Sequence, residues 1–259
     1  MRDALADMER FKDDEQYYGD TTYVTNSQLG WLSKSPQNYM HRLNNSEESS
    51  ALTFGKAFHW AVLEPDKFND QVVYFEGKVR RGKAYDEFKL AAEGKTILTK
   101  KEYENILEMS DIIRGHEEIA PMLLETDNIK YEQANVWQDP DTGIWCKGKA
   151  DVVFYQGAEV PFILDVKTTK DASINNFRRS SWNYGYDRQA AYYMDGFGAK
   201  EFWFVVIEKE APFNMGLFKA GEKFLTDGRS KYKNLLSLYS EFFIEKTRNP
   251  EDYLEKGDL

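Results

Sequence analysis

Two apolar runs separated by a turn stand out within residues 148–169, where the pattern predicts two strands. In the first strand Asp151 opens the apolar run 152–155, which a Gln-Gly pair ends. The second strand is apolar up to Asp165, and Lys167 follows two residues later. Because strand side chains alternate between faces, Asp165 and Lys167 point the same way. If the two strands pair, Asp151 joins them at one edge of a sheet.

The rest of the chain alternates between helical and strand periodicities, which indicates an α/β protein. The predicted helices cover residues 27–32, a second start at Ser35-Pro36, and residues 51–63, 84–93, 100–116, 174–181, 184–197 and 221–246. The predicted strands cover residues 131–138, 144–155, 201–208 and 213–219, and residues 71–84 are expected to be irregular. No internal repeat, low-complexity run or linker divides the sequence, so a single domain over residues 1–259 is favoured.

Composition agrees with a folded protein, since 15% of the residues are aromatic. No apolar run approaches the roughly 20 residues that cross a bilayer, and the charged first residues do not read as a signal peptide. The single cysteine, Cys146, excludes internal disulfides and fits a reducing cytoplasm. With three histidines in the chain, a zinc site made of several histidines is not expected. We therefore expect a cytoplasmic protein without a membrane segment.

The formal net charge of −10 argues against a protein that merely coats nucleic acid. It does not exclude an enzyme whose acids gather metal ions while basic residues form a local patch. The basic residues that lie close after the acidic strands are Lys167, Lys170, Arg178, Arg179 and Arg188. Such residues are ordinarily a solvated surface, but their clustering favours contact with phosphate groups.

The trio Asp151, Asp165 and Lys167 has two interpretations. Two carboxylates and a lysine at a sheet edge can hold a divalent cation and an activated water. The alternative is a structural ion pair between Asp165 and Lys167, because structural ion pairs cluster in the same way. A charge at the end of an apolar strand is unusual, but the strand pattern alone gives the two interpretations about equal weight.

Four further polar residues stand where a structural role is the default. His59 lies inside an apolar predicted helix, where a histidine usually bonds a backbone carbonyl of the core, and a ligand role is the alternative. Glu132 begins the strand before the first acidic strand, and we expect a solvated acid on its outer face. Gln189 and Tyr193 lie one helical turn apart on one face, which by itself indicates only an amphipathic helix.

Taken together, the order His59, Asp151, Asp165-x-Lys167, Gln189-xxx-Tyr193 resembles the PD-(D/E)xK nuclease superfamily, in its RecB-like branch. The segments GKAFHWAVLEP, KGKADVV, ILDVKTTKDAS and YDRQAAYYMDG are similar to the RecE-type family of exodeoxyribonuclease VIII and phage recombination exonucleases. The resemblance spans residues 22–209. The sequence departs from it where alanine replaces the proline that often precedes the first acid, and it lacks the cysteines of the iron–sulfur branch.

The resemblance implies a role for each of these residues. The metal ligands that it implies are His59, Asp151, Asp165 and the Val166 carbonyl. Lys167 would position or help to deprotonate the attacking water, while Gln189 and Tyr193 would support the site and place the DNA strand. Glu132 corresponds to an upstream acid of some relatives. Magnesium suits carboxylate, carbonyl and water ligands, and a histidine also tolerates manganese.

The fold that the resemblance implies is a restriction-endonuclease-like α/β core, with a central mixed β-sheet flanked by helices. Within one domain, residues 1–50 would be an N-terminal helical segment, residues 51–220 the catalytic core and residues 221–259 a C-terminal helix.

The activity that the resemblance implies is a magnesium-dependent DNA exonuclease that resects the ends of linear double-stranded DNA, 5′ to 3′. The single-stranded tails would serve phage-type recombination and repair, beside a single-strand annealing protein, and relatives assemble as homo-oligomeric rings. One alternative is a RecB-like nuclease that acts on single strands or as an endonuclease. Another is a catalytically inert DNA-binding or interaction module on the same fold, which the intact set His59, Asp151, Asp165 and Lys167 disfavours.

Overall fold

The computed structural model describes residues 3–45, 49–77, 79–124 and 126–255, so the two ends of the predicted domain fall outside it. The strands of the central sheet are β3 (Ile129–Gln138), β4 (Trp145–Gln156), β5 (Glu159–Thr169), β6 (Ala199–Glu208) and β7 (Met215–Lys219). A second, smaller sheet pairs β1 (Val72–Phe75) with β2 (Thr96–Thr99).

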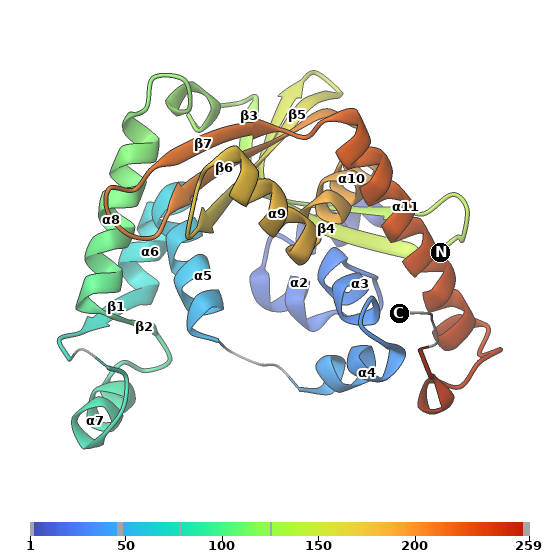
Figure 1. Cartoon of the computed structure of the whole chain (residues 1–259), viewed down its shortest axis with the longest axis horizontal. Helices are drawn as coiled ribbons and strands as arrows, with labels where there is room; N and C mark the ends of the chain where they lie inside the picture. The colour runs from blue at the N-terminus through green and yellow to red at the C-terminus, as the bar shows by residue number, and fades with distance from the viewer. Residues whose placement is uncertain (1–2, 46–48, 78, 125, 256–259) are drawn as a thin grey trace.

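The helices surround this sheet (Figure 1). They are α1 (Ala4–Arg10), α2 (Asp14–Gly19), α3 (Asn26–Leu32), α4 (Pro36–Asn44), α5 (Ser50–Leu63), α6 (Pro65–Gln71), α7 (Lys83–Ala91), α8 (Lys100–Gly115), α9 (Ile174–Tyr184), α10 (Tyr186–Phe197) and α11 (Glu222–Tyr239), with short turns η1 (Ala120–Met122), η2 (Ser240–Ile244) and η3 (Pro250–Asp252). Among the described residues, no helix is both long and apolar enough to span a membrane.

The central sheet has the strand order β3-β4-β5-β6-β7, in which only β5 and β6 run parallel and the other neighbours are antiparallel. A mixed sheet flanked by helices confirms the predicted fold class. Its two faces carry separate hydrophobic cores, because successive residues of a buried strand point to opposite sides. On β5, Leu164 packs in the core with α5 and α8, while Ile163 packs in the core with α10.

Local sequence signals fixed several helix starts as predicted. Thr25 caps α3 and Thr99 caps α8, each through a capping box with the residue three positions on, and Ser35 caps α4. Pro65 follows the end of α5 and also opens α6. Proline lacks an N–H, and the first turn of a helix tolerates it because N–H groups there have no partner within the helix.

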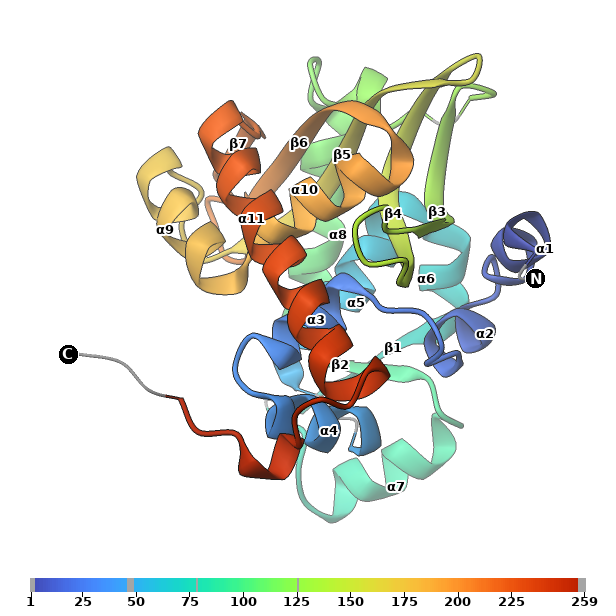
Figure 2. The same cartoon turned by 90° about the vertical axis from the view of Figure 1, so that its right-hand side faces the viewer.

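Other expectations about the elements were wrong. Residues 71–84 are not wholly irregular, because β1 forms there as a four-residue strand that pairs with β2, about twenty residues later. So short a strand carries no readable alternation, and only its distant partner defines it. The helix expected over 221–246 ends at Tyr239 and continues as the π-helical turn η2. Helix α7 projects away from the body of the molecule in both views (Figures 1 and 2).

Candidate active site

The predicted acids flank the point where β4 and β5 separate. The last paired residues there are Val152 and Leu164, and β5 then pairs only with β6. Beyond this point a side chain replaces the backbone ladder, because the Val166 N–H donates to Asp151 Oδ2 over 2.8 Å. At this fork, where β4 and β5 separate, the hydrogen bond fixes Asp151 against the backbone between Asp165 and Lys167. Asp151 is 8% exposed.

His59 reaches the same fork from α5. Its Nε2 lies 2.7 Å from the Val166 carbonyl oxygen, and its Nδ1 lies 3.6 Å from Asp151 Oδ2. His59 thus does hydrogen-bond a backbone carbonyl, as the default interpretation states. The carbonyl, however, belongs to the residue between the predicted catalytic acid and lysine, and the imidazole is partly accessible. This position equally suits a metal ligand.

Asp165 and Lys167 lie on one face of β5, as the strand period predicted. They form an ion pair in which Asp165 is 1% exposed, and Gln189 Nε2 of α10 donates to Asp165 Oδ2 over 2.7 Å. Burial raises the pKa of Asp165 to about 6, with Lys167 opposing the shift and Asp151 adding to it. Burial works against the charge of Lys167, but the two carboxylates outweigh it and raise the lysine pKa above its usual value. Lys167 is therefore protonated at neutral pH.

Glu132 was expected to be a solvated acid on the outer face of its strand, and this expectation was wrong. One ligand atom each of His59, Glu132 and Asp151 lie within 4.8 Å of one another. Glu132 adopts φ = 46° in the middle of β3, a left-handed conformation that strand periodicity cannot foresee. Burial and the charges of Asp151 and Glu64 raise the pKa of Glu132 to about 8. Such crowding of acids is costly unless a cation is bound among them.

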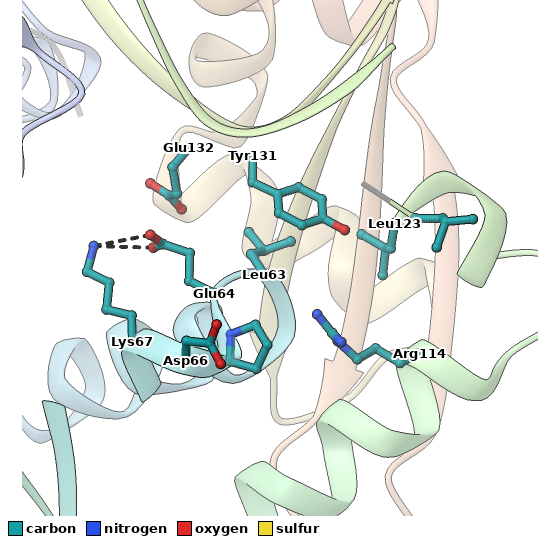
Figure 3. A pocket seen from close by; sticks show the side chains of 10 residues that line it. Leu63, Glu64, Asp66, Lys67, Arg114, Leu123, Tyr131 and Glu132 are labelled. Atoms are coloured by element: carbon teal, nitrogen blue, oxygen red, sulfur yellow. Dashed lines mark hydrogen bonds and ion pairs between the residues drawn. The ribbon is translucent and has the colours of Figure 1, made fainter. Parts of the chain in front are cut away.

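The donor set fits a hard divalent cation. Carboxylate oxygens, one carbonyl oxygen and one imidazole nitrogen are ligands for magnesium or manganese, and no soft thiolate is among them. Beside this group lies an open pocket of about 620 Å³, a volume within the range of ligand sites. Figure 3 shows Glu132 and Glu64 facing one another across it, with Lys67 paired to Glu64 at 3.3 Å.

The remaining predicted residues divide between the site and its surroundings. Tyr193 of α10 packs against Gly148, where an added Cβ would lie 2.9 Å from the ring, and burial raises its pKa well above the usual value. Arg178, Arg179 and Lys170 are exposed, at the end of β5 and on α9. Arg188 does not lie with them.

Arg188 is 8% exposed, and its Nε donates to Asn26 Oδ1 over 2.9 Å. It therefore belongs to the packing between α10 and α3 rather than to a DNA-facing surface. Sequence position placed it beside the basic cluster, but the helix period turned it inward. Two site neighbours carried no signal in the sequence: Tyr186, whose ring centroid lies 5.3 Å from Lys167 Nζ, and Glu64.

A mixed sheet whose forked strands carry two acids and a lysine, with a histidine against the fork, defines a PD-(D/E)xK-like protein. The sequence matches the family described as PDDEXK-like domain of unknown function (DUF3799) over residues 25–254. The chain therefore belongs to this family. None of the curated proteins compared with the chain matches its sequence.

A solved structure shares the fold of this chain. A candidate exonuclease from Eubacterium rectale is 15% identical and superposes with a TM-score of 0.61, with 95% of each chain covered. A phage-related exonuclease from Haemophilus somnus 129PT is 14% identical, with a TM-score of 0.37 and coverage of 87% of this chain and 96% of that one. At 15% identity, the likeness to the Eubacterium rectale protein shows the fold alone.

Proposed function

We propose that this protein is a divalent-metal-dependent nuclease that hydrolyses phosphodiester bonds of DNA. The observation that carries the proposal is the convergence of His59, Glu132 and Asp151 within 4.8 Å, beside the buried Asp165–Lys167 pair. A structural ion pair alone explains Asp165 and Lys167. It does not explain why two further acids, Glu132 and Asp151, and a histidine are crowded against them.

The residues divide the chemistry among them. His59, Asp151, Glu132, Asp165 and the Val166 carbonyl would hold magnesium or manganese, which when bound supplies a nucleophile at neutral pH and neutralises charge on the phosphate. Lys167 would orient the attacking water and stabilise negative charge in the transition state. Gln189 donates a hydrogen bond that orients Asp165. Tyr193 packs on Gly148 of β4 and supports the site from the side of α10.

The finer proposal is a RecE-type exonuclease that resects linear double-stranded DNA from 5′ to 3′ and leaves single-stranded tails for recombination. The motif order supports it, and the fold likeness to the Eubacterium rectale candidate exonuclease agrees with it. Lys170, Arg178 and Arg179 would contact the DNA backbone. A single domain, a cytoplasmic location, a ring of identical subunits and a single-strand annealing partner complete this proposal.

A labelled-duplex digestion tests the proposal. The wild-type protein is incubated with a 5′-labelled linear duplex and with a closed circle of the same sequence, in magnesium, in manganese and in EDTA. We expect hydrolysis of the linear duplex with either metal, release of label in short products, an intact circle and no reaction in EDTA. Cutting of the closed circle would contradict the exonuclease proposal and indicate an endonuclease, because a circle has no ends.

An inert module on the same fold makes the opposite prediction. Calorimetric titration of the wild-type protein with magnesium and with manganese should show binding that Asp151→Asn weakens. Absence of binding together with absence of hydrolysis would overturn the nuclease proposal.

A further inference from the structure

Helix α2 lies on the side of β4 that carries Asp151. Lys147, Lys149 and Asp151 follow one another at intervals of two residues and so point to the same side of the strand. The Lys147 side chain is 2% exposed, and its Nζ donates to the carbonyls of Tyr17 and Asp20, the second over 2.6 Å. The positions on this side of β4 that precede Asp151 are therefore occupied by contacts to α2.

A carboxylate of α2 links the two elements that flank the site. Asp14 accepts from Lys149 Nζ of β4 over 2.5 Å and from Lys67 Nζ of α6 over 2.7 Å. Lys149 is almost fully buried, so the pair is poorly screened by solvent. Lys67 in turn contacts Glu64, which faces Glu132 across the pocket (Figure 3). Helix α2 is thus held at the rim of the metal group from two directions.

With α2 held in this way, one of its aromatic rings, that of Tyr18, is exposed to solvent. Tyr17 is 6% exposed and anchors α2, whereas its neighbour Tyr18 is 72% exposed, with the two rings edge to face at 5.1 Å. Asp14 and Tyr18 are four residues apart on α2, so they lie on the same face of the helix. Asp14 ties this face to Lys149 of β4 and Lys67 of α6, so the exposed ring of Tyr18 lies on the side of α2 that these two elements hold.

We propose that α2 forms a wall of the active site and that Tyr18 stacks on a nucleotide of the substrate strand beside the metal group. The inference rests on the proposed nuclease function. Every base has an aromatic face, so stacking on an exposed ring holds a strand without regard to sequence. The segment that carries α2 precedes residue 25, where the family match begins.

Replacement of the ring measures its role. Tyr18→Ala should raise KM for DNA by about fivefold to a hundredfold, the range that stacking of one base provides, with kcat little changed. Tyr18→Phe should behave like the wild type, because the ring and not the hydroxyl makes the contact. Leu5→Ala is the matched control, since Leu5 is 78% exposed and belongs to α1 rather than α2. Binding of a fluorescent single-stranded oligonucleotide in EDTA should follow the same order.

Removal of the ion pairs that Asp14 makes with Lys149 and Lys67 gives a second test. Asp14→Ala frees α2 from β4 and α6, so it should raise KM in the same direction as Tyr18→Ala while thermal melting shows a folded protein. The inference is overturned if Tyr18→Ala keeps the wild-type KM and oligonucleotide affinity, or if Tyr18→Phe loses as much as Tyr18→Ala. A wild-type protein that hydrolyses no DNA defeats the proposed function instead. Hydrolysis that neither variant alters defeats only this inference.

Discussion

Replacement of Lys167 by alanine separates a catalytic lysine from a structural ion pair. In the folded protein Asp165 is 1% exposed and has two polar partners, the Lys167 ammonium group and the Gln189 amide. Removal of the lysine leaves a buried carboxylate with only the neutral amide. Loss of one partner of a buried pair costs about 3–5 kcal/mol, so we expect a decrease of this size in the free energy of unfolding.

The same substitution should lower kcat by about 10²- to 10⁴-fold in magnesium, because the group that orients the water and stabilises charge is gone. Unfolding cannot account for such a loss. A domain with a stability of about 5–15 kcal/mol keeps at least about half of its molecules folded after losing 3–5 kcal/mol, so unfolding lowers the rate by at most about twofold. Comparing the decrease in the free energy of unfolding with the decrease in kcat therefore shows whether Lys167 is catalytic or only structural.

Urea unfolding and single-turnover hydrolysis of a labelled duplex, on the same preparations, provide both numbers. Lys223→Ala is the control, since Lys223 is exposed on α11 and its pair with Asp227 is a surface one of about 0.3–0.5 kcal/mol. A Lys167→Ala protein that cuts DNA at the wild-type rate in magnesium refutes the assignment. A loss of activity that vanishes when corrected for the folded fraction would make the pair structural only.

Close packing, a buried charge and the exposed face of α9 each give a further expectation. Gly228→Ala drives a methyl group into the backbone of α10 and should cost about 1–3 kcal/mol in urea unfolding, whereas Gly55→Ala, which meets open space, should be neutral or stabilising. Burial lowers the pKa of Lys147 from 10.5 to about 8, so the folded protein releases this proton before the unfolded chain does. Stability relative to Lys147→Met should therefore rise between pH 8 and pH 10.5 in melts recorded across this range, and a flat difference would contradict the shift. Joint replacement of Arg178 and Arg179 by alanine should weaken DNA binding and reduce the salt slope of the affinity by about 2, and an unchanged slope would exclude phosphate contact.

The sequence by itself determined the features that depend on near neighbours. Helix starts at Thr25 and Thr99 were readable because a cap and its partner lie three residues apart. The alternation that placed Asp165 and Lys167 on one face is likewise a property of two neighbouring positions. These signals were enough to predict an α/β protein and to place the acid and the lysine on one face, whereas the mixed sheet and the metal site were predicted from the family resemblance.

The tertiary structure alone decided how the site is assembled. His59 and Val166 meet across 107 residues of chain, and only the packing of α5 on the fork of β4 and β5 brings them together. Glu132 entered the site through a left-handed backbone angle, and Arg188 left the predicted basic patch through the helix period. Contacts of this kind depend on how distant elements pack, and local periodicity contains no information about that packing. The same reason hid the position of α2: the ion pairs of Asp14 with Lys149 and Lys67 join segments that lie far apart in the sequence.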